Sequence, residues 1–141
     1  MTATPYHLDI RIYYEDTDFS GVVYHASYLR FLERGRTELL RSLGIHHAAL
    51  HVGAAGASLA FAVRAMTLDF LRPALMDDMV TVETWPLAVG GASLGMSQRI
   101  LRGETLLLTA AVRIVAVAGG RAVRLPRDLR ERLVTAQVTG R

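Results

Sequence analysis

The sequence predicts an α+β fold in which one long helix packs on one face of a curved antiparallel sheet of about five strands. Three observations lead to this prediction. A helical period fills residues 27–43, an alternating segment precedes it, and four strand-like segments follow it with short turns between them. Strands that are joined by short turns pair antiparallel, and one dominant helix can then cover one face of their sheet.

The first expected element is a strand over His7–Tyr14. One face of this segment is apolar and the other is mostly polar, with Leu8, Ile10, Ile12 and Tyr14 alternating with His7, Asp9, Arg11 and Tyr13. Alternation of this kind is typical of a strand with one buried face.

The long helix is expected over Ser27–Leu43. Apolar or small residues recur there at steps of three and four, at Tyr28, Phe31, Leu32, Gly35, Leu39 and Leu43. Charged residues fall mostly on the other side, and Gly44 follows as a stop signal. Leu29 and Leu40 are expected to widen the apolar stripe, as in a helix that a sheet encloses.

The remaining elements follow in order. Residues 45–56 predict a short helix or a loop, and a terminal helix is expected within Arg127–Gln137, after Pro126. Between them lie four expected strands, Ser58–Phe70, Met79–Leu87, Ser93–Leu101 and Thr105–Val117. We find no linker, so residues 1–141 are expected to form a single domain. A curved antiparallel sheet around one long helix is the hotdog arrangement, and its open edges favour a dimer with a continuous sheet.

Composition narrows the range of functions. Of the 141 residues, 51% are apolar and none is cysteine, which excludes disulfides and thiolate catalysis and fits a reducing compartment. The N-terminus lacks a signal-peptide pattern. The longest apolar stretch, residues 106–120, is interrupted by Thr109 and Arg113 and is too short to span a bilayer as a helix. We expect a cytoplasmic protein with no membrane span.

The net charge is +3, and all 16 basic residues are arginine. They are spread along the chain, without the clustered stripe interleaved with aromatics that is typical of nucleic-acid binding. Guanidinium groups do pair well with the phosphates of an anionic ligand. The sequence does not single out the arginines that would do so.

The segment most informative about function is residues 13–28, which read YYEDTDFSGVVYHASY. Three acids precede a turn at Gly21, and His25 lies where the long helix begins. The first N–H groups of a helix are unpaired and lie at the positive end of its dipole, so they can stabilise an oxyanion. A carboxylate and an imidazole beside such groups suit acyl-transfer chemistry.

Asp18 has two interpretations. Its carboxylate can attack a thioester carbonyl or deprotonate a water molecule that does so. Alternatively it only shapes the turn from Asp18 to Gly21, which is a common role of aspartate. Glu15 and Asp16 are weaker candidates, because consecutive acids cannot all face a pocket, and Asp16 is expected to hydrogen-bond the backbone of the loop.

His25 also has two interpretations. Its backbone N–H can donate to the substrate oxygen, while its ring orients the substrate or moves a proton. The alternative is a partly exposed residue at the helix entry with no role. Asp18 and His25 together are a stronger signal than either residue alone.

Three further histidines, His46, His47 and His51, are close in sequence. A metal site would need another ligand and supporting side chains, and no clear carboxylate is nearby. We therefore expect surface histidines and no metal site.

The segment YYEDTDFSGVVYHASYLRFLERGRTE, residues 13–38, closely resembles the YbgC-like branch of the 4-hydroxybenzoyl-CoA thioesterase superfamily. These are acyl-CoA thioesterases often encoded with the Tol-Pal envelope system. A second match is MTLDFLRPALMDD, residues 66–78, and a looser one covers residues 93–117. The resemblance implies a hotdog fold and hydrolysis of an acyl-CoA to a free acid and CoA. It also implies a homodimer, or a homotetramer built from such dimers, and no metal or cofactor, since CoA is part of the substrate.

The resemblance also implies roles for individual residues. Asp18 matches the catalytic carboxylate, as nucleophile or general base. The N–H of His25 matches the group that polarises the thioester carbonyl, and its ring matches an assisting imidazole. Tyr24, His25 and Tyr28 match substrate-binding positions, with no chemical role for the tyrosines. Asp18 and the first amides of the helix are then expected to face one cavity at a subunit junction.

Two alternatives stay open. A hotdog enoyl-CoA hydratase would place an aspartate and a histidine about five residues apart with an Asn-Pro pair, a pattern that this chain lacks. A non-catalytic or weakly catalytic adaptor would bind acyl carrier protein or phospholipid-synthesis partners, and the scattered arginines would suit an acidic partner.

Overall fold

The computed structural model describes residues 4–45, 51–52 and 57–137. Its main sheet is antiparallel and six-stranded, in the order β1-β5-β6-β7-β4, with the short β8 paired to the end of β7. Its strands are β1 (Tyr6–Arg11), β4 (Ala60–Phe70), β5 (Met79–Val89), β6 (Ser93–Arg102), β7 (Thr105–Ala118) and β8 (Arg121–Ala122). A separate pair joins β2 (His51–Val52) to β3 (Ala57–Ser58).

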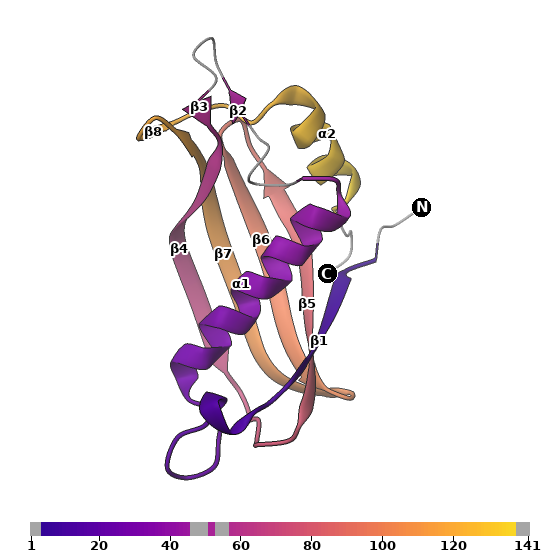
Figure 1. The fold of residues 1–141 in the computed structure, drawn as a ribbon. Helices are drawn as coiled ribbons and strands as arrows, with labels where there is room; N and C mark the ends of the chain where they lie inside the picture. The colour runs from indigo at the N-terminus through magenta and orange to yellow at the C-terminus, as the bar shows by residue number, and fades with distance from the viewer. Residues whose placement is uncertain (1–3, 46–50, 53–56, 138–141) are drawn as a thin grey trace.

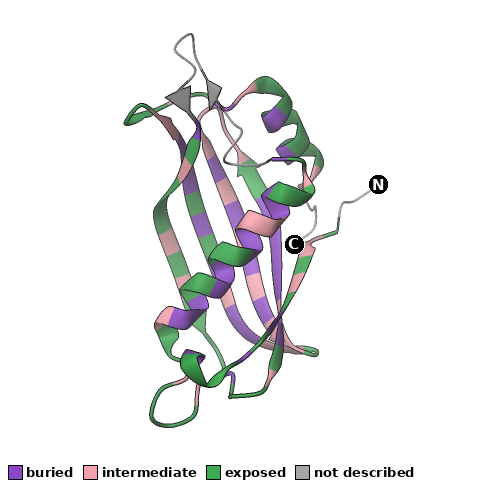
Figure 2. Ribbon diagram, in the orientation of Figure 1, coloured by how far each residue is buried: buried purple, intermediate pink, exposed green. Residues whose placement is uncertain are grey.

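Helix α1 (His25–Ser42) lies diagonally across one face of the main sheet (Figure 1). The side of α1 that faces the sheet is buried and the opposite side is exposed (Figure 2). Its buried residues are Ser27, Tyr28, Phe31, Leu32, Gly35, Arg36, Leu39 and Leu40. The predicted α+β hotdog arrangement of one long helix on a curved antiparallel sheet is confirmed.

The core lies between α1 and the central strands. Alternate residues of these strands are buried against the helix, among them Val80, Val82, Leu94, Met96, Ile100, Leu108, Val112 and Ile114. The second helix, α2 (Arg127–Thr135), follows Pro126 as predicted and adds Leu129 and Leu133 to the same core. Each large apolar side chain that is removed from water in this way contributes about 1.5–3 kcal/mol.

Strand β4 forms one edge of the main sheet. Within the described part of the chain it pairs only with β7, so its other side has no backbone partner there. Val63 and Phe70 of this strand are 47% and 51% exposed. The strand carries two charged residues, Arg64 and Asp69, and is otherwise mostly apolar. A long open edge of this kind is a template for pairing with another strand.

The first strand is shorter than the predicted His7–Tyr14. It ends at Arg11, Ile12 and Tyr13 belong to no helix or strand, and Tyr14 begins a 3-10 helix, η1 (Tyr14–Asp16). The reason is local, because the Asp16 carboxylate accepts a hydrogen bond of 2.9 Å from the Tyr13 N–H and turns the chain there. The prediction that Tyr14 lies on the buried face is wrong, since this side chain is 81% exposed.

Helix α1 begins two residues before the predicted Ser27, at His25. Leu40 is 3% exposed and extends the buried stripe as predicted, but Leu29 is 39% exposed and does not. The sheet covers only one side of α1 within the described residues, so the stripe is narrower than an enclosed helix would need.

Most of the predicted helix or loop over residues 45–56 lies outside the described residues. Within that stretch, residues 51 and 52 form strand β2 and are neither helix nor loop. Within the described residues, no helix combines the length and the apolar character that a membrane crossing requires.

Candidate active site

The loop between η1 and α1 is a tight turn held by its own backbone. The Asp18 N–H donates to the Val22 carbonyl oxygen at 2.9 Å, and the Gly21 N–H donates to the Asp18 carbonyl oxygen at 3.2 Å. Thr17 and Val23 form a further antiparallel bridge at its base. Gly21 has a φ of 81°, a left-handed conformation that glycine adopts without a steric penalty.

The carboxylate of Asp18 is hydrogen-bonded within this loop. One oxygen, Oδ1, accepts from the Ser20 N–H at 2.9 Å and from the Ser20 hydroxyl group at 2.6 Å. These bonds, first of all the one from the hydroxyl, hold the pKa of Asp18 below its ordinary value, so the group is ionised at neutral pH. The side chain is exposed, and its bonds to Ser20 show that Asp18 shapes the turn. Its catalytic role stays a prediction.

The start of α1 presents unpaired amides. Tyr24 precedes the helix, and the Ser27 N–H donates to the Tyr24 carbonyl oxygen at 2.8 Å. The N–H groups of His25 and Ala26 have no hydrogen-bond partner among the described residues. Two donors side by side at the positive end of a helix are suited to bind a negatively charged oxygen.

Asp16 hydrogen-bonds the backbone of the loop, as the sequence predicts, and it also supports the helix start. Its carbonyl oxygen accepts the Tyr24 N–H at 2.9 Å, and its carboxylate accepts the Tyr13 N–H. Asp16 is 8% exposed, and Arg30 of α1 lies 3.4 Å from its Oδ1 atom. Asp16 therefore holds η1 and the helix start together, and it lines a separate depression with Glu15 and Arg34.

An apolar hollow of about 300 Å³ opens beside the helix start, lined by Val23, His25, Tyr28, Phe70, Leu71, Arg72 and Pro73. The ring of Tyr28 contacts that of Phe70, with 5.8 Å between centroids, and its hydroxyl oxygen accepts the Ala74 N–H at 3.0 Å. Burial raises the pKa of Tyr28, so its hydroxyl group stays neutral and cannot serve as a base.

The structure brings some of the predicted site residues together. His25 and Tyr28 line the hollow, and the Tyr24 ring packs on the His25 ring with 4.5 Å between centroids. Asp18 and Tyr24 are not among the lining residues. Within one chain, the Asp18 carboxylate lies in solvent and not in the cavity that we expected it to share with the helix amides.

Sequence reasoning missed the opposite wall of the hollow. Phe70, Leu71, Arg72 and Pro73 come from the end of β4 and the connection to β5. The second matching segment, residues 66–78, contains all four residues and was the available signal. Periodicity could not assign them to the site, because only the sheet places this connection beside the start of α1.

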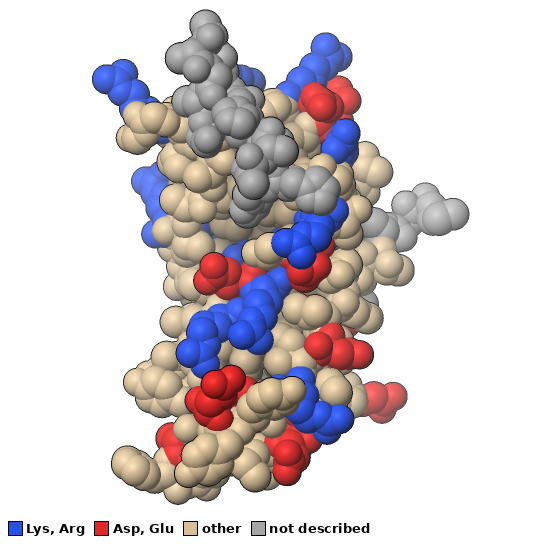
Figure 3. Space-filling view, in the orientation of Figure 1, with Lys and Arg blue, Asp and Glu red and all other residues tan. Residues whose placement is uncertain are grey.

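The exposed face of α1 carries charges of both signs (Figure 3). Arg30, Glu33, Arg34, Thr37 and Glu38 line a shallow depression there, and Arg41 pairs with Glu38 at 2.9 Å. Mixed charge of this kind is not the basic stripe that nucleic acids require. Among the described residues no three metal-ligand side chains gather, and His46 and His47 lie outside those residues.

Comparison with known proteins relates the chain to one family. The thioesterase superfamily model matches residues 20–109. The acyl-CoA thioester hydrolase YbgC of Escherichia coli O6:H1 is 45% identical over 83% of this chain and 85% of its own length. The acyl-CoA thioesterase YbgC of Haemophilus influenzae is 39% identical over 92% of this chain and 95% of its own length.

Among solved structures, a probable thioesterase from Bartonella henselae superimposes with a TM-score of 0.82 at 46% identity. The match covers 86% of this chain and 99% of that one. The fold, the helix start and these similarities agree, and the chain belongs to the thioesterase superfamily as a YbgC-like enzyme with the hotdog fold.

Proposed function

We propose that this protein hydrolyses acyl-CoA thioesters to a free acid and CoA. The observation that carries the proposal is that the N–H groups of His25 and Ala26, beside an apolar hollow, have no hydrogen-bond partner in the part of the chain that the structure describes. The hollow suits an acyl chain, and the two donors suit the oxygen of its carbonyl group. The relatives named as acyl-CoA thioester hydrolases support the substrate class.

The chemistry follows from these groups. The two N–H groups stabilise the carbonyl oxygen as it becomes negative in the tetrahedral intermediate. Asp18 attacks the carbonyl carbon, or removes a proton from the water that attacks it. If Asp18 activates water, the C–S bond breaks as the tetrahedral intermediate collapses, the acid is released, and the proton on Asp18 passes to the CoA thiolate. If Asp18 attacks directly, the C–S bond breaks to leave a mixed anhydride on Asp18; a water molecule then hydrolyses this anhydride, which releases the acid, regenerates the carboxylate and supplies the proton that the CoA thiolate takes up. The ring of His25 assists by orienting the thioester, and Tyr24 and Tyr28 contact the bound acyl-CoA.

A second copy of the chain would complete the site. In one chain, Asp18 is exposed, and the outer edge of β4 has no strand partner among the described residues. Large apolar side chains near the same end of the molecule are also exposed, namely Phe19 at 112%, Tyr24 at 48%, Phe70 at 51% and Leu75 at 46%. We infer a homodimer that pairs the β4 edges and encloses the Asp18 loop, and that assembles further to a homotetramer.

The proposed reaction needs no cofactor, because a carboxylate and backbone amides supply the whole chemistry. The lack of cysteine supports a cytoplasmic location, where thiols stay reduced and acyl-CoA is made. Phe19 lies beside Asp18 at the loop tip, so we infer that it limits the length or shape of the acyl group.

The test is release of free CoA thiol from a panel of acyl-CoAs that varies chain length and includes aromatic acyl groups. We expect turnover with at least one member, and loss of most of that turnover in Asp18→Asn. The amide keeps the size of the side chain, so circular dichroism and sedimentation should match the wild type. Full activity in Asp18→Asn would refute the assignment of the carboxylate.

The same panel separates the enzyme from the adaptor. No hydrolysis of any member, together with tight binding of acyl carrier protein, would support the adaptor and exclude the hydrolase.

A further inference from the structure

The connection between β4 and β5, residues 71–78, is bonded directly to the loop that bears Asp18. The Val23 N–H donates to the Ala74 carbonyl oxygen at 2.8 Å, and Val22 and Leu75 form an antiparallel bridge. Val22 in turn accepts the Asp18 N–H at 2.9 Å. The position of the Asp18 loop therefore depends on where this connection lies.

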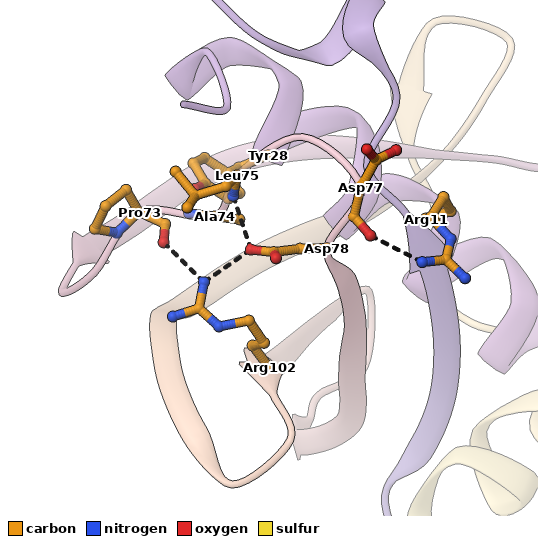
Figure 4. A network of polar contacts seen from close by, with 8 residues as sticks. All are labelled: Arg11, Tyr28, Pro73, Ala74, Leu75, Asp77, Asp78 and Arg102. Atoms are coloured by element: carbon orange, nitrogen blue, oxygen red, sulfur yellow. Dashed lines mark hydrogen bonds and ion pairs between the residues drawn. The ribbon is translucent and has the colours of Figure 1, made fainter. Parts of the chain in front are cut away.

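One ion pair holds the connection. The Asp78 carboxylate accepts from the Leu75 N–H and from Arg102, each at 2.8 Å through Oδ2. The same Arg102 nitrogen, Nη1, donates to the Pro73 carbonyl oxygen at 3.3 Å (Figure 4). Arg102 is the last residue of β6, so one guanidinium group bonds the rim of the sheet to both halves of the connection.

Bonds to β1 and α1 fix the connection from other sides. The Asp77 N–H donates to the Ile12 carbonyl oxygen and the Ile12 N–H donates to the Asp78 carbonyl oxygen, both at 2.9 Å. Arg11 donates to the Asp77 carbonyl oxygen at 2.8 Å, and the Tyr28 hydroxyl group accepts the Ala74 N–H (Figure 4). The backbone of the connection thus stays paired when the ion pair is removed, and the fold does not depend on that pair alone.

The expected sizes of the two effects distinguish a role of this ion pair in fold stability from a role in positioning the catalytic groups. The side chains of Arg102 and Asp78 are 38% and 22% exposed, and a partly exposed pair of this kind stabilises a fold by only about 1 kcal/mol or less. By contrast, a displacement of about 1 Å at a catalytic group can cost roughly 100-fold in rate. Burial acts to raise the pKa of Asp78, but the bonds from Leu75 and Arg102 outweigh it and leave the pKa below its ordinary value. The pair is therefore charged at neutral pH.

We propose that Asp78 and Arg102 are positioning residues for thioester hydrolysis, which hold the β4–β5 connection and through it the Asp18 loop and the start of α1. Neither residue needs to touch the substrate. The inference rests on the proposed function, and it adds residues from β6 and the β5 entry to a site otherwise formed by the N-terminal part of the chain and the end of β4.

The experiment compares Arg102→Ala and Asp78→Asn with a matched control on the same strand. Arg99 also forms a partly buried ion pair on β6, at 2.7 Å from Glu83, but among the described residues it makes no hydrogen bond to the connection. Arg99→Ala therefore measures how the loss of an ion pair on the sheet, without any bond to the connection, changes kcat and KM. For each variant, kcat and KM are measured with the best acyl-CoA of the panel, and amide hydrogen exchange is followed at Asp18 and Val23.

We expect Arg102→Ala and Asp78→Asn to lower kcat about tenfold to 100-fold with KM changed less than about threefold. Exchange at Asp18 and Val23 should accelerate in both. Arg99→Ala should leave kcat and these amides unchanged. Arg102→Lys should restore most of kcat, because a single nitrogen makes both contacts and the lysine ammonium group can replace it.

Equal losses of kcat in Arg102→Ala and Arg99→Ala would overturn the proposal, and so would a rise in KM with kcat unchanged, which would indicate contact with the substrate. Asp78→Asn, which keeps size and an acceptor oxygen, carries the test if Arg102→Ala folds poorly. A failure of the proposed function can be distinguished from a failure of this positioning proposal. If the wild type hydrolyses no acyl-CoA, exchange at Asp18 and Val23 still shows whether the pair positions the loop.

Discussion

Gly35 of α1 lies so close to Thr84 of β5 that a Cβ atom at position 35 would be 2.8 Å from the Thr84 hydroxyl oxygen. The same atom would be 2.8 Å from a methyl group of Val82. Thr84 also accepts a hydrogen bond from Gln98, whose amide group donates at 2.9 Å to the Leu32 carbonyl oxygen as well. The glycine therefore sets how closely the helix approaches the sheet.

Gly35→Ala is expected to destabilise the protein. Alanine favours the helix by about 1 kcal/mol, but overpacking a tight contact costs about 1–3 kcal/mol, and here the contact is on two sides. We expect a net loss of about 1–2 kcal/mol in urea unfolding at a fixed protein concentration. Gly95→Ala is the control, because its nearest contact would be an ordinary 3.5 Å from Ala88. Equal stability of the two variants would contradict the close-approach argument.

Ser20→Ala is expected to raise the pKa of Asp18. The hydroxyl hydrogen bond stabilises the ionised carboxylate, so its removal shifts the pKa upward toward the ordinary value. The acid limb of kcat/KM should then move to higher pH, because the ionised form is lost earlier as the pH falls. NMR titration of the Asp18 carboxyl carbon measures the shift directly.

Thr17→Val is the matched control for Ser20→Ala. It removes a hydroxyl group of the same loop that bonds to the Tyr14 carbonyl oxygen at 2.7 Å and not to Asp18. An equal pKa change in both variants would mean that the loop as a whole, and not the Ser20 bond, sets the pKa of Asp18.

Asp18→Asn should reduce hydrolysis more than His25→Ala. Loss of a catalytic base or nucleophile typically costs about 10²–10⁴-fold, whereas alanine at position 25 keeps the backbone N–H at the helix start. The His25 ring packs on Tyr24 and has no hydrogen-bond partner in the described chain, so its removal should perturb little else. Single-turnover rates with one acyl-CoA rank the two variants. A total loss in His25→Ala with an intact fold would reverse this ranking.

Val63→Lys should convert the protein to monomers and lower its activity. Val63 lies on the open edge strand β4 and is 47% exposed, and lysine on an edge strand opposes pairing with another strand. Sedimentation velocity measures the assembly and thiol release measures the activity. Val134→Lys, at a 41% exposed position of α2, is the control and should change neither. Monomers with full activity would show that one chain holds a complete site.

Much of the site could be predicted from local sequence patterns. The segment from Asp16 to Tyr28 predicts a turn, a helix start and unpaired amides, and the structure has all three. These features depend on residues that are close in sequence, so turn chemistry and helical period are sufficient to predict them. The Asp16 bond to the loop backbone was predicted for the same reason.

Local sequence patterns could not predict which polar groups are buried. Arg36 is 7% exposed and donates to Gln98 at 3.0 Å, and burial lowers the pKa of its guanidinium group. Its place in the helical sequence is compatible with a solvated charge. Only the packing of β6 beneath the helix provides the amide oxygen that makes its burial tolerable.

The sequence by itself determined the type and order of the main helices and long strands, the free amides of the long helix, and the family of the chain, because these depend on local periodicity and on short motifs. Tertiary structure decided the rest. It placed Phe70 and Pro73 beside the helix start, joined Asp78 to Arg102 beneath the Asp18 loop, and left the Asp18 carboxylate exposed in a single chain. Such contacts form between residues distant in the chain, and only the pairing and curvature of the sheet bring those residues together.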